Sequence, residues 1–166
     1  GPVPRQIARA AEEIARAQAP GLYVGGGLVR ARAEEELRTL VELSDAPVVT
    51  TLPARGAFPD SDPHNLKMPG MHGTVPAVGA LQRADLIVAL GARFDDRVTG
   101  QLDSFAPRAR IVHVDIDLAE MSKNRYADVA VVADLKPALA ALNAALPAAY
   151  ERLGRPDLTG WWRYLN

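Results

Sequence analysis

Glycine, arginine and aspartate follow several short apolar runs of this sequence. Three glycines, Gly25 to Gly27, follow the first run, Arg93 follows the third, and Asp115 and Asp134 stand at the ends of two more. Glycines let backbone amides approach a phosphate, arginine neutralises it, and a carboxylate at a strand end accepts hydrogen bonds from ribose hydroxyls. These residue types predict a site for a nucleotide cofactor.

The site requires the apolar runs to be strands of one parallel sheet, because the carboxyl ends of such strands meet at one edge. The residues that follow the runs are Gly25 to Gly27, Thr51, Leu52, Gly91 to Asp95, Asp115 to Asp117, and Asp134. We expect these residues to lie near one another.

An ordinary NAD site is disfavoured. The pattern Gly25-x-Gly27-x-x-Arg30 lacks the third glycine, and the second run ends without the acid that is expected about 20 residues after the glycines. The three glycines have two equally good explanations, which are a tight turn from strand to helix and phosphate binding. For Asp117, but not for Asp115, capping of a following helix is the favoured interpretation. Asp95, Asp96 and Arg97 could form a surface ion pair.

Catalytic and metal-binding patterns are missing from the sequence. His64, His72 and His113 have no metal-ligand spacing, and there is no cysteine to complete a zinc site. Neither a Gly-x-Ser-x-Gly motif nor a P-loop lysine is present. We therefore expect no metal site and no self-sufficient catalytic group.

The hydrophobic pattern alternates between strands and helices. Strands are predicted at Leu22–Val24, Pro47–Thr51, Asp85–Gly91, Ile111–Ile116 and Val129–Val132; helices are predicted from Pro4 to near Gly21, at Ala31–Leu43, at Val75–Gln82, and from Leu135 to Leu146 with Asp134 as cap. Near-continuous apolar strands are typical of a parallel sheet covered on both faces. The predicted fold is doubly wound α/β, with five to six mostly parallel strands.

Pro147 is the one natural boundary. It divides a domain at residues 1–147 from a tail at residues 148–166. The tail ends in an apolar cluster that includes Trp161, Trp162 and Tyr164. This cluster either caps the domain or begins a following one.

Composition excludes several classes of protein. The chain has 166 residues, a net charge of −1 and no cysteine. Disulfide scaffolds and thiolate chemistry are excluded. No basic field favours nucleic acid or anionic membranes, and no apolar run approaches the ~20 residues that span a bilayer. We expect a soluble, cytoplasmic protein.

Five motifs together resemble one family. They are Tyr23–Gly27, Thr51–Pro59, Met68–Thr74, Gly91–Gly100 and Val112–Asp117. In this order they resemble the central domain of the catalytic subunit of acetolactate synthase, also called acetohydroxyacid synthase, over about residues 4 to 146. The resemblance implies a three-domain enzyme that joins two 2-keto acids with loss of CO2. It also implies that thiamine diphosphate and Mg²⁺ lie between the two flanking domains.

By the same resemblance, the central domain binds FAD that takes no part in net redox chemistry. The implied FAD residues are Gly26, Thr51, Leu52, Pro69, Gly70, Met71, His72, Gly91, Ala92, Arg93, Phe94, Asp95, Asp115, Ile116, Asp134 and Leu135. Asp96 and Arg97 are implied to face the substrate channel. Pro53 departs from the methionine that the family commonly has. No catalytic residue is expected here, so the domain alone is expected to be inactive.

Two other functions remain open at this stage. One is a middle domain of another thiamine diphosphate enzyme that binds ADP, or no ligand, as a structural or regulatory module. The other, a nicotinamide oxidoreductase, is disfavoured by the incomplete glycine pattern. The resemblance further implies a homodimeric or homotetrameric parent enzyme with a small regulatory subunit.

Overall fold

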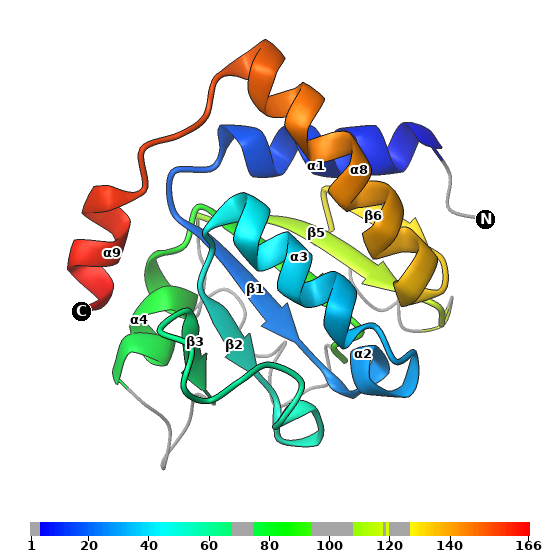
Figure 1. The fold of residues 1–166 in the computed structure, drawn as a ribbon, viewed down its shortest axis with the longest axis horizontal. Helices are drawn as coiled ribbons and strands as arrows, with labels where there is room; N and C mark the ends of the chain where they lie inside the picture. Colours follow the sequence, from blue (N-terminus) through cyan, green and yellow to red (C-terminus); the bar gives the residue numbers. More distant parts are fainter. Residues whose placement is uncertain (1–3, 68–74, 94–107, 118, 120–126) are drawn as a thin grey trace.

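The computed structural model describes residues 4–67, 75–93, 108–117, 119 and 127–166 (Figure 1). Its elements are α1 (Pro4–Arg16), β1 (Pro20–Val24), α2 (Gly26–Arg30), α3 (Glu34–Ser44), β2 (Val48–Thr50), the 3-10 helix η1 (Leu52–Ala54), β3 (Asn65–Lys67), α4 (Val75–Arg83), β4 (Leu86–Leu90), β5 (Arg110–Asp115), β6 (Val129–Val132), α8 (Leu135–Leu153) and α9 (Thr159–Leu165).

The strands form one sheet in the order β3-β2-β1-β4-β5-β6, and every neighbouring pair is parallel. The predicted doubly wound α/β class is therefore confirmed. The chain leaves β1 toward β2 in one direction and returns to the other side of β1 with β4. The crevice between the carboxyl ends of β1 and β4 is thus the point at which the strand order reverses.

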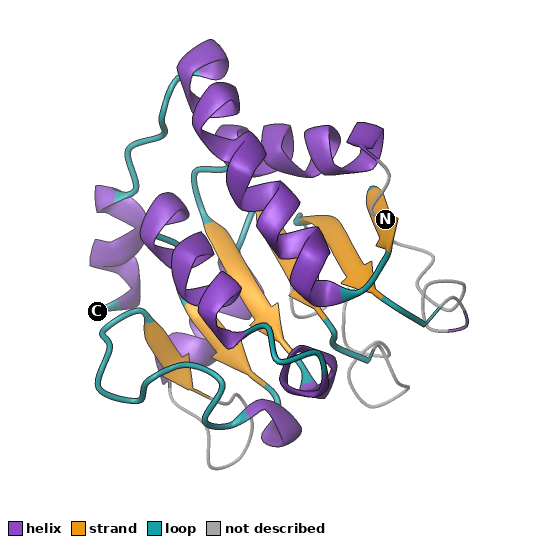
Figure 2. Cartoon of the chain, turned by 45° about the vertical axis from the view of Figure 1, so that its right-hand side comes forward, coloured by secondary structure: helices purple, strands orange, loops and turns teal. Residues whose placement is uncertain are grey.

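Two apolar layers cover the sheet, which lies between helices in Figure 2. Successive residues of β4 show the division, because side chains alternate across a strand. Leu86 and Val88 pack into the layer that contains residues of α1, α2, α3 and α8. Ile87 and Ala89 pack into the second layer with residues of α4 and α9. Burial on both faces explains why the strand is a continuous apolar run.

The structure differs from the prediction in four elements. The first helix ends at Arg16 because β1 already begins at Pro20. The helix expected from Ala31 is α3, which begins only at Glu34, because Arg32 has a φ of 55° that is incompatible with helix. Helix α2, which precedes it, was not predicted. Strand β3 was not predicted: it has three residues, and only Leu66 among them is buried.

The last helix of the predicted domain continues through Pro147 to Leu153, so Pro147 does not end it. Proline costs about 3 kcal/mol inside a helix, but burial of Leu146 and Ala149 on either side offsets that cost. After α8, helix α9 packs into the same apolar layer as α4, against one face of the sheet. Trp161 is buried there, and its Nε1 donates to the Pro20 carbonyl at 2.9 Å. The terminal apolar cluster therefore covers this domain.

A histidine joins α9 to the amino ends of β2 and β3. The His64 ring nitrogens lie 2.7 Å from carboxylate oxygens of Asp62 and Asp45. Trp162 stacks edge-on against the ring at 5.3 Å and donates to the Asp45 carbonyl. Burial alone would lower the pKa of His64, but the two carboxylates outweigh it and raise that pKa above its usual value.

Candidate functional site

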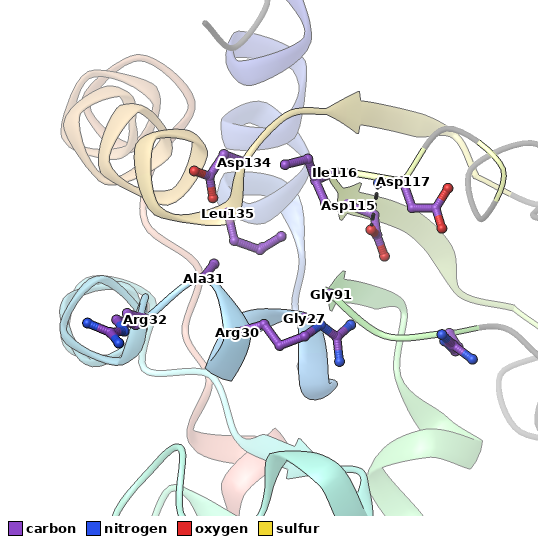
Figure 3. A pocket seen from close by; sticks show the side chains of 11 residues that line it. Gly27, Arg30, Ala31, Arg32, Gly91, Asp115, Ile116, Asp117, Asp134 and Leu135 are labelled. Atoms are coloured by element: carbon purple, nitrogen blue, oxygen red, sulfur yellow. Dashed lines mark hydrogen bonds between the residues drawn. The ribbon is translucent and has the colours of Figure 1, made fainter.

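A pocket of about 490 Å³ opens at the carboxyl edge of the sheet, beside the reversal of strand order (Figure 3). It is lined by α2 and the turn after it, and by the segments that follow β4, β5 and β6. The lining residues are Gly27, Arg30, Ala31, Arg32, Gly91, Arg93, Asp115, Ile116, Asp117, Asp134 and Leu135. Residues after β1, β4, β5 and β6 therefore converge in this pocket, whereas Thr51 and Leu52, predicted after the second strand, do not line it.

The glycines at this edge allow two backbone segments to touch. A Cβ on Gly25 would lie 2.4 Å from the Cα of Ala92, and one on Gly27 would lie 2.8 Å from the Cα of Gly91. Gly91 itself has a φ of +62°, a conformation that glycine adopts without steric cost. The turn after β1 is consequently locked against the loop after β4, and this fixes the floor of the pocket.

Internal hydrogen bonds occupy three of the amides at that turn. The Gly25 N–H donates to the Leu90 carbonyl and the Gly27 N–H donates to the Gly91 carbonyl, both at 3.0 Å. The Leu28 N–H donates to the Gly25 carbonyl at 3.1 Å. Of the two interpretations of the glycines, the tight turn accounts for Gly25 and Gly27.

Asp115 is a buried carboxylate at the end of β5. Its Oδ1 accepts from the Asp117 N–H at 2.9 Å, and its Oδ2 lies 3.8 Å from Nε2 of the fully buried His113. Burial alone would raise the pKa of Asp115, but the His113 ring and the backbone N–H groups of Asp117 and Ile116 hold it below its usual range. Asp115 is therefore ionised at neutral pH and can accept hydrogen bonds from the hydroxyl groups of a ligand.

Three arginines supply positive charge to the pocket. Arg30, Arg32 and Arg93 are all exposed, and among the described residues none of them forms an ion pair. Arg30 comes from the last turn of α2, and Figure 3 shows its guanidinium extending toward Gly27 and Gly91. These side chains are available to an anionic ligand.

The remaining lining residues complete the anionic side. Asp117 accepts from the Ala119 N–H at 2.9 Å, the contact expected of a capping residue. Asp134 stands at the N-cap position of α8 but makes no side-chain capping hydrogen bond. Ile116, 66% exposed, offers an apolar surface between them.

The structure brings together six of the residues implied by the family resemblance. They are Gly91, Arg93, Asp115, Ile116, Asp134 and Leu135. Four others are described but do not line this pocket: Gly26, Thr51, Leu52 and Ala92. The remaining implied residues, Pro69, Gly70, Met71, His72, Phe94, Asp95, Asp96 and Arg97, lie outside the described residues.

The four that do not line the pocket have distinct places. Ala92 is fully buried beneath the glycine turn. Thr51 and Leu52 continue the edge beyond β2, where Leu52 is 65% exposed. Gly26 faces Pro53, whose Cβ would lie 3.0 Å from a Cβ at position 26. Pro53, where this sequence departs from the family, therefore lies against the glycine turn.

Sequence reasoning missed Arg30, Ala31 and Arg32 as lining residues. The signal available was the spacing, because Arg30 lies three residues, about one helical turn, after Gly27. This spacing was not enough to place Arg30 at the pocket, because neither helix α2 nor the turn at Arg32 was predicted.

No cluster of three or more His, Cys, Asp or Glu suited to a metal is present in the described ranges. His113 and His64 are both engaged by neighbouring groups, as expected of structural histidines. His72 lies outside the described residues. Of the helices in the described part of the chain, none is long and apolar enough to cross a membrane.

The strand order and the pocket at its reversal define a doubly wound domain of the architecture in which nucleotides bind at this place. Residues 7–142 match the family model of the thiamine pyrophosphate enzyme central domain. The chain belongs to this family.

Individual relatives carry one name. The chain is 60% identical over 162 residues to the acetolactate synthase of Mycobacterium leprae, a match of 98% of this chain and 26% of that protein. It is 51% identical over 165 residues to the acetolactate synthase large subunit of Corynebacterium glutamicum, covering 99% and 26%. For the chloroplastic acetolactate synthase 1 of Zea mays, identity is 55% over 133 residues, covering 80% and 20%.

The chain thus spans about a quarter of the length of the first two relatives. The resemblance inferred from the motifs is confirmed over nearly all of its sequence.

Proposed function

We propose that this chain is the central domain of an acetolactate synthase and that its pocket binds the adenosine diphosphate part of FAD. The observation that carries the proposal is the ionised, buried Asp115 at the end of β5, in a pocket that is also lined by arginines without an ion-pair partner among the described residues. A ribose needs acceptors for its hydroxyl groups and a diphosphate needs cations, and the pocket contains both.

The parent enzyme would condense pyruvate with a second pyruvate or with 2-ketobutyrate and release CO2 in branched-chain amino-acid biosynthesis. Thiamine diphosphate and Mg²⁺ would supply that chemistry from the flanking domains. The part proposed for this domain is to hold FAD without net redox change and, through Asp96 and Arg97, to border the substrate channel. Support comes from the high identity to proteins named acetolactate synthase.

The domain alone should not form acetolactate. The test is incubation with pyruvate, thiamine diphosphate, Mg²⁺ and FAD, with a full-length relative as positive control. We expect acetolactate from the control and none from this chain. Turnover by this chain would contradict the assignment of the catalytic groups to other domains.

The binding proposal is tested by calorimetry with FAD and ADP on the wild type and on Asp115→Asn. Loss of a charge-assisted contact worth about 1.5–3 kcal/mol should weaken both ligands by about ten- to a hundredfold. Asp60→Asn, at an exposed loop position outside the pocket, is the matched control and should bind both ligands like the wild type. An Asp115 variant that binds ADP normally would refute the ribose assignment.

The described lining also suits ADP alone, the second candidate ligand. Its residues come from the ends of β1, β4, β5 and β6 and account for an adenosine diphosphate without requiring a flavin. Tighter binding of FAD than of ADP by the same sample supports the flavin role. Equal affinities would favour the ADP-binding module.

The assembly of the parent is proposed on the names of its relatives. The Corynebacterium glutamicum protein is called a large subunit. We propose a homodimeric or homotetrameric parent in the cytoplasm that binds a small regulatory subunit, which copurification with the full-length protein would test.

A further inference from the structure

Most of the amides that the glycine turn would offer to a phosphate already donate to carbonyl groups of the chain. The Gly25 N–H donates to the carbonyl of Leu90, the last residue of β4, the Gly27 N–H donates to the Gly91 carbonyl, and the Leu28 N–H donates to Gly25 within the turn itself. A phosphate held at a glycine-rich turn usually accepts hydrogen bonds from such backbone amides. With the Gly26 N–H the one glycine amide of the turn outside these bonds, most of the charge of a diphosphate must be met by side chains.

The charged side chains of the pocket are divided between its two sides. Asp115, Asp117 and Asp134 follow β5 and β6, whereas Arg30 and Arg93 follow β1 and β4. A diphosphate placed beside the aspartates would be repelled, and a ribose placed there would find acceptors. This polarity orients a nucleotide with its ribose toward β5 and β6 and its phosphates toward β1 and β4.

Arg30 is the cation best placed on the second side. Its Nη1 lies 3.1 Å from the position that a Cβ on Gly26 would occupy, so the guanidinium lies over the glycine turn. Figure 3 shows the side chain directed toward Gly27 and Gly91 at the floor of the pocket. It has no carboxylate partner among the described residues, which leaves its fork of N–H donors free for phosphate oxygens.

Arg32 has the same charge but a different position. It sits in the left-handed turn between α2 and α3, and its carbonyl accepts from Lys136 Nζ of α8 at 3.3 Å. In Figure 3 its side chain lies beyond Ala31, away from Gly91. Substitution of Arg32 therefore provides a matched control: it removes the same charge as substitution of Arg30, but from a different position.

We propose that Arg30 is the diphosphate-binding residue of this pocket and takes the place of the occupied amides of the glycine turn. The inference rests on the proposed nucleotide site and adds the residue that recognises its phosphates. It also predicts selectivity for nucleoside diphosphates over nucleosides through one side chain.

The experiment measures ADP and FAD binding by calorimetry, and adenosine binding by NMR titration, on the 166-residue chain. For Arg30→Gln we expect ADP and FAD to weaken roughly five- to thirtyfold, with adenosine unchanged within about twofold. Arg30→Lys should recover part of the loss, because it restores the charge but not the fork. Thermal unfolding of each variant verifies that this exposed substitution leaves the fold intact.

Two results would overturn the role of Arg30 and leave the site itself standing: wild-type ADP affinity in Arg30→Gln, or an equal loss in Arg32→Gln. A third is distinct. If the wild type binds neither ADP nor FAD, the nucleotide site is wrong and Arg30 has no diphosphate to bind.

Discussion

Replacing Gly25 with alanine should destabilise the domain strongly, because the new methyl group would enter the contact between two backbone segments. The built Cβ lies 2.4 Å from the Cα of Ala92 and 2.5 Å from the carbonyl oxygen of Gly91, whereas ordinary contacts are 3.4–4 Å. The segments must separate by about 1 Å to relieve this overlap.

Neither segment can move at small cost. The Gly25 N–H is bonded to the Leu90 carbonyl and the Gly91 N–H to the Val114 carbonyl, at 3.0 and 2.9 Å. Overpacking usually costs about 1–3 kcal/mol, and contact with fixed backbone places Gly25→Ala near the upper limit, about 3 kcal/mol. For a domain of this size that lowers Tm by roughly 6–12 °C.

Gly160→Ala in α9 is the matched control, since the same methyl group there meets no atom within 4 Å. Alanine is the better helix former by up to about 1 kcal/mol, so this variant should be as stable as the wild type or slightly more. Both variants are measured by urea unfolding with the m-value compared. Wild-type stability in Gly25→Ala, or an equal loss in Gly160→Ala, would refute the packing argument.

Three further predictions concern α9 and its contacts. His64→Gln should lower the free energy of unfolding by about 0.5–1 kcal/mol at pH 6, because the raised pKa of His64 makes the stabilisation by its charged ring complete below about pH 6.5. The loss should shrink as the pH rises through the pKa of His64 in the folded state. Urea unfolding at pH 6 and pH 9 tests this, and a pH-independent difference would contradict it. Trp161→Phe should cost about 1–3 kcal/mol, since the buried Pro20 carbonyl loses its donor. Trp162→Phe removes a similar bond at an exposed site and should cost about 1 kcal/mol or less. Urea unfolding measures both tryptophan variants, and equal losses would show that burial does not decide the effect.

The sequence by itself determined the class of fold. Strands β4, β5 and β6 were predicted nearly at their observed bounds, because burial on both faces makes each strand a continuous apolar run. It also identified strand-end residues such as Arg93, Asp115 and Asp134 that now line one pocket. These inferences succeed because they depend on local pattern and on the common polarity of parallel strands.

Tertiary contacts decided the rest. Strand β3 carries a single buried side chain, Leu66, and exists because β2 pairs with it. Helix α8 passes Pro147 because the residues around it pack into the core, a gain that no local preference reveals.

The site shows the same division between local pattern and long-range contact. The glycine turn could be interpreted as a phosphate cradle or as a tight turn until the Gly25 and Gly27 N–H groups were seen to bond with the carbonyls of Leu90 and Gly91, more than 60 residues away in sequence. Arg30 became a candidate ligand only once α2 had placed it on the pocket. Residue types specify which chemistry is possible, but pairing between distant segments determines which donors and acceptors remain free to perform it.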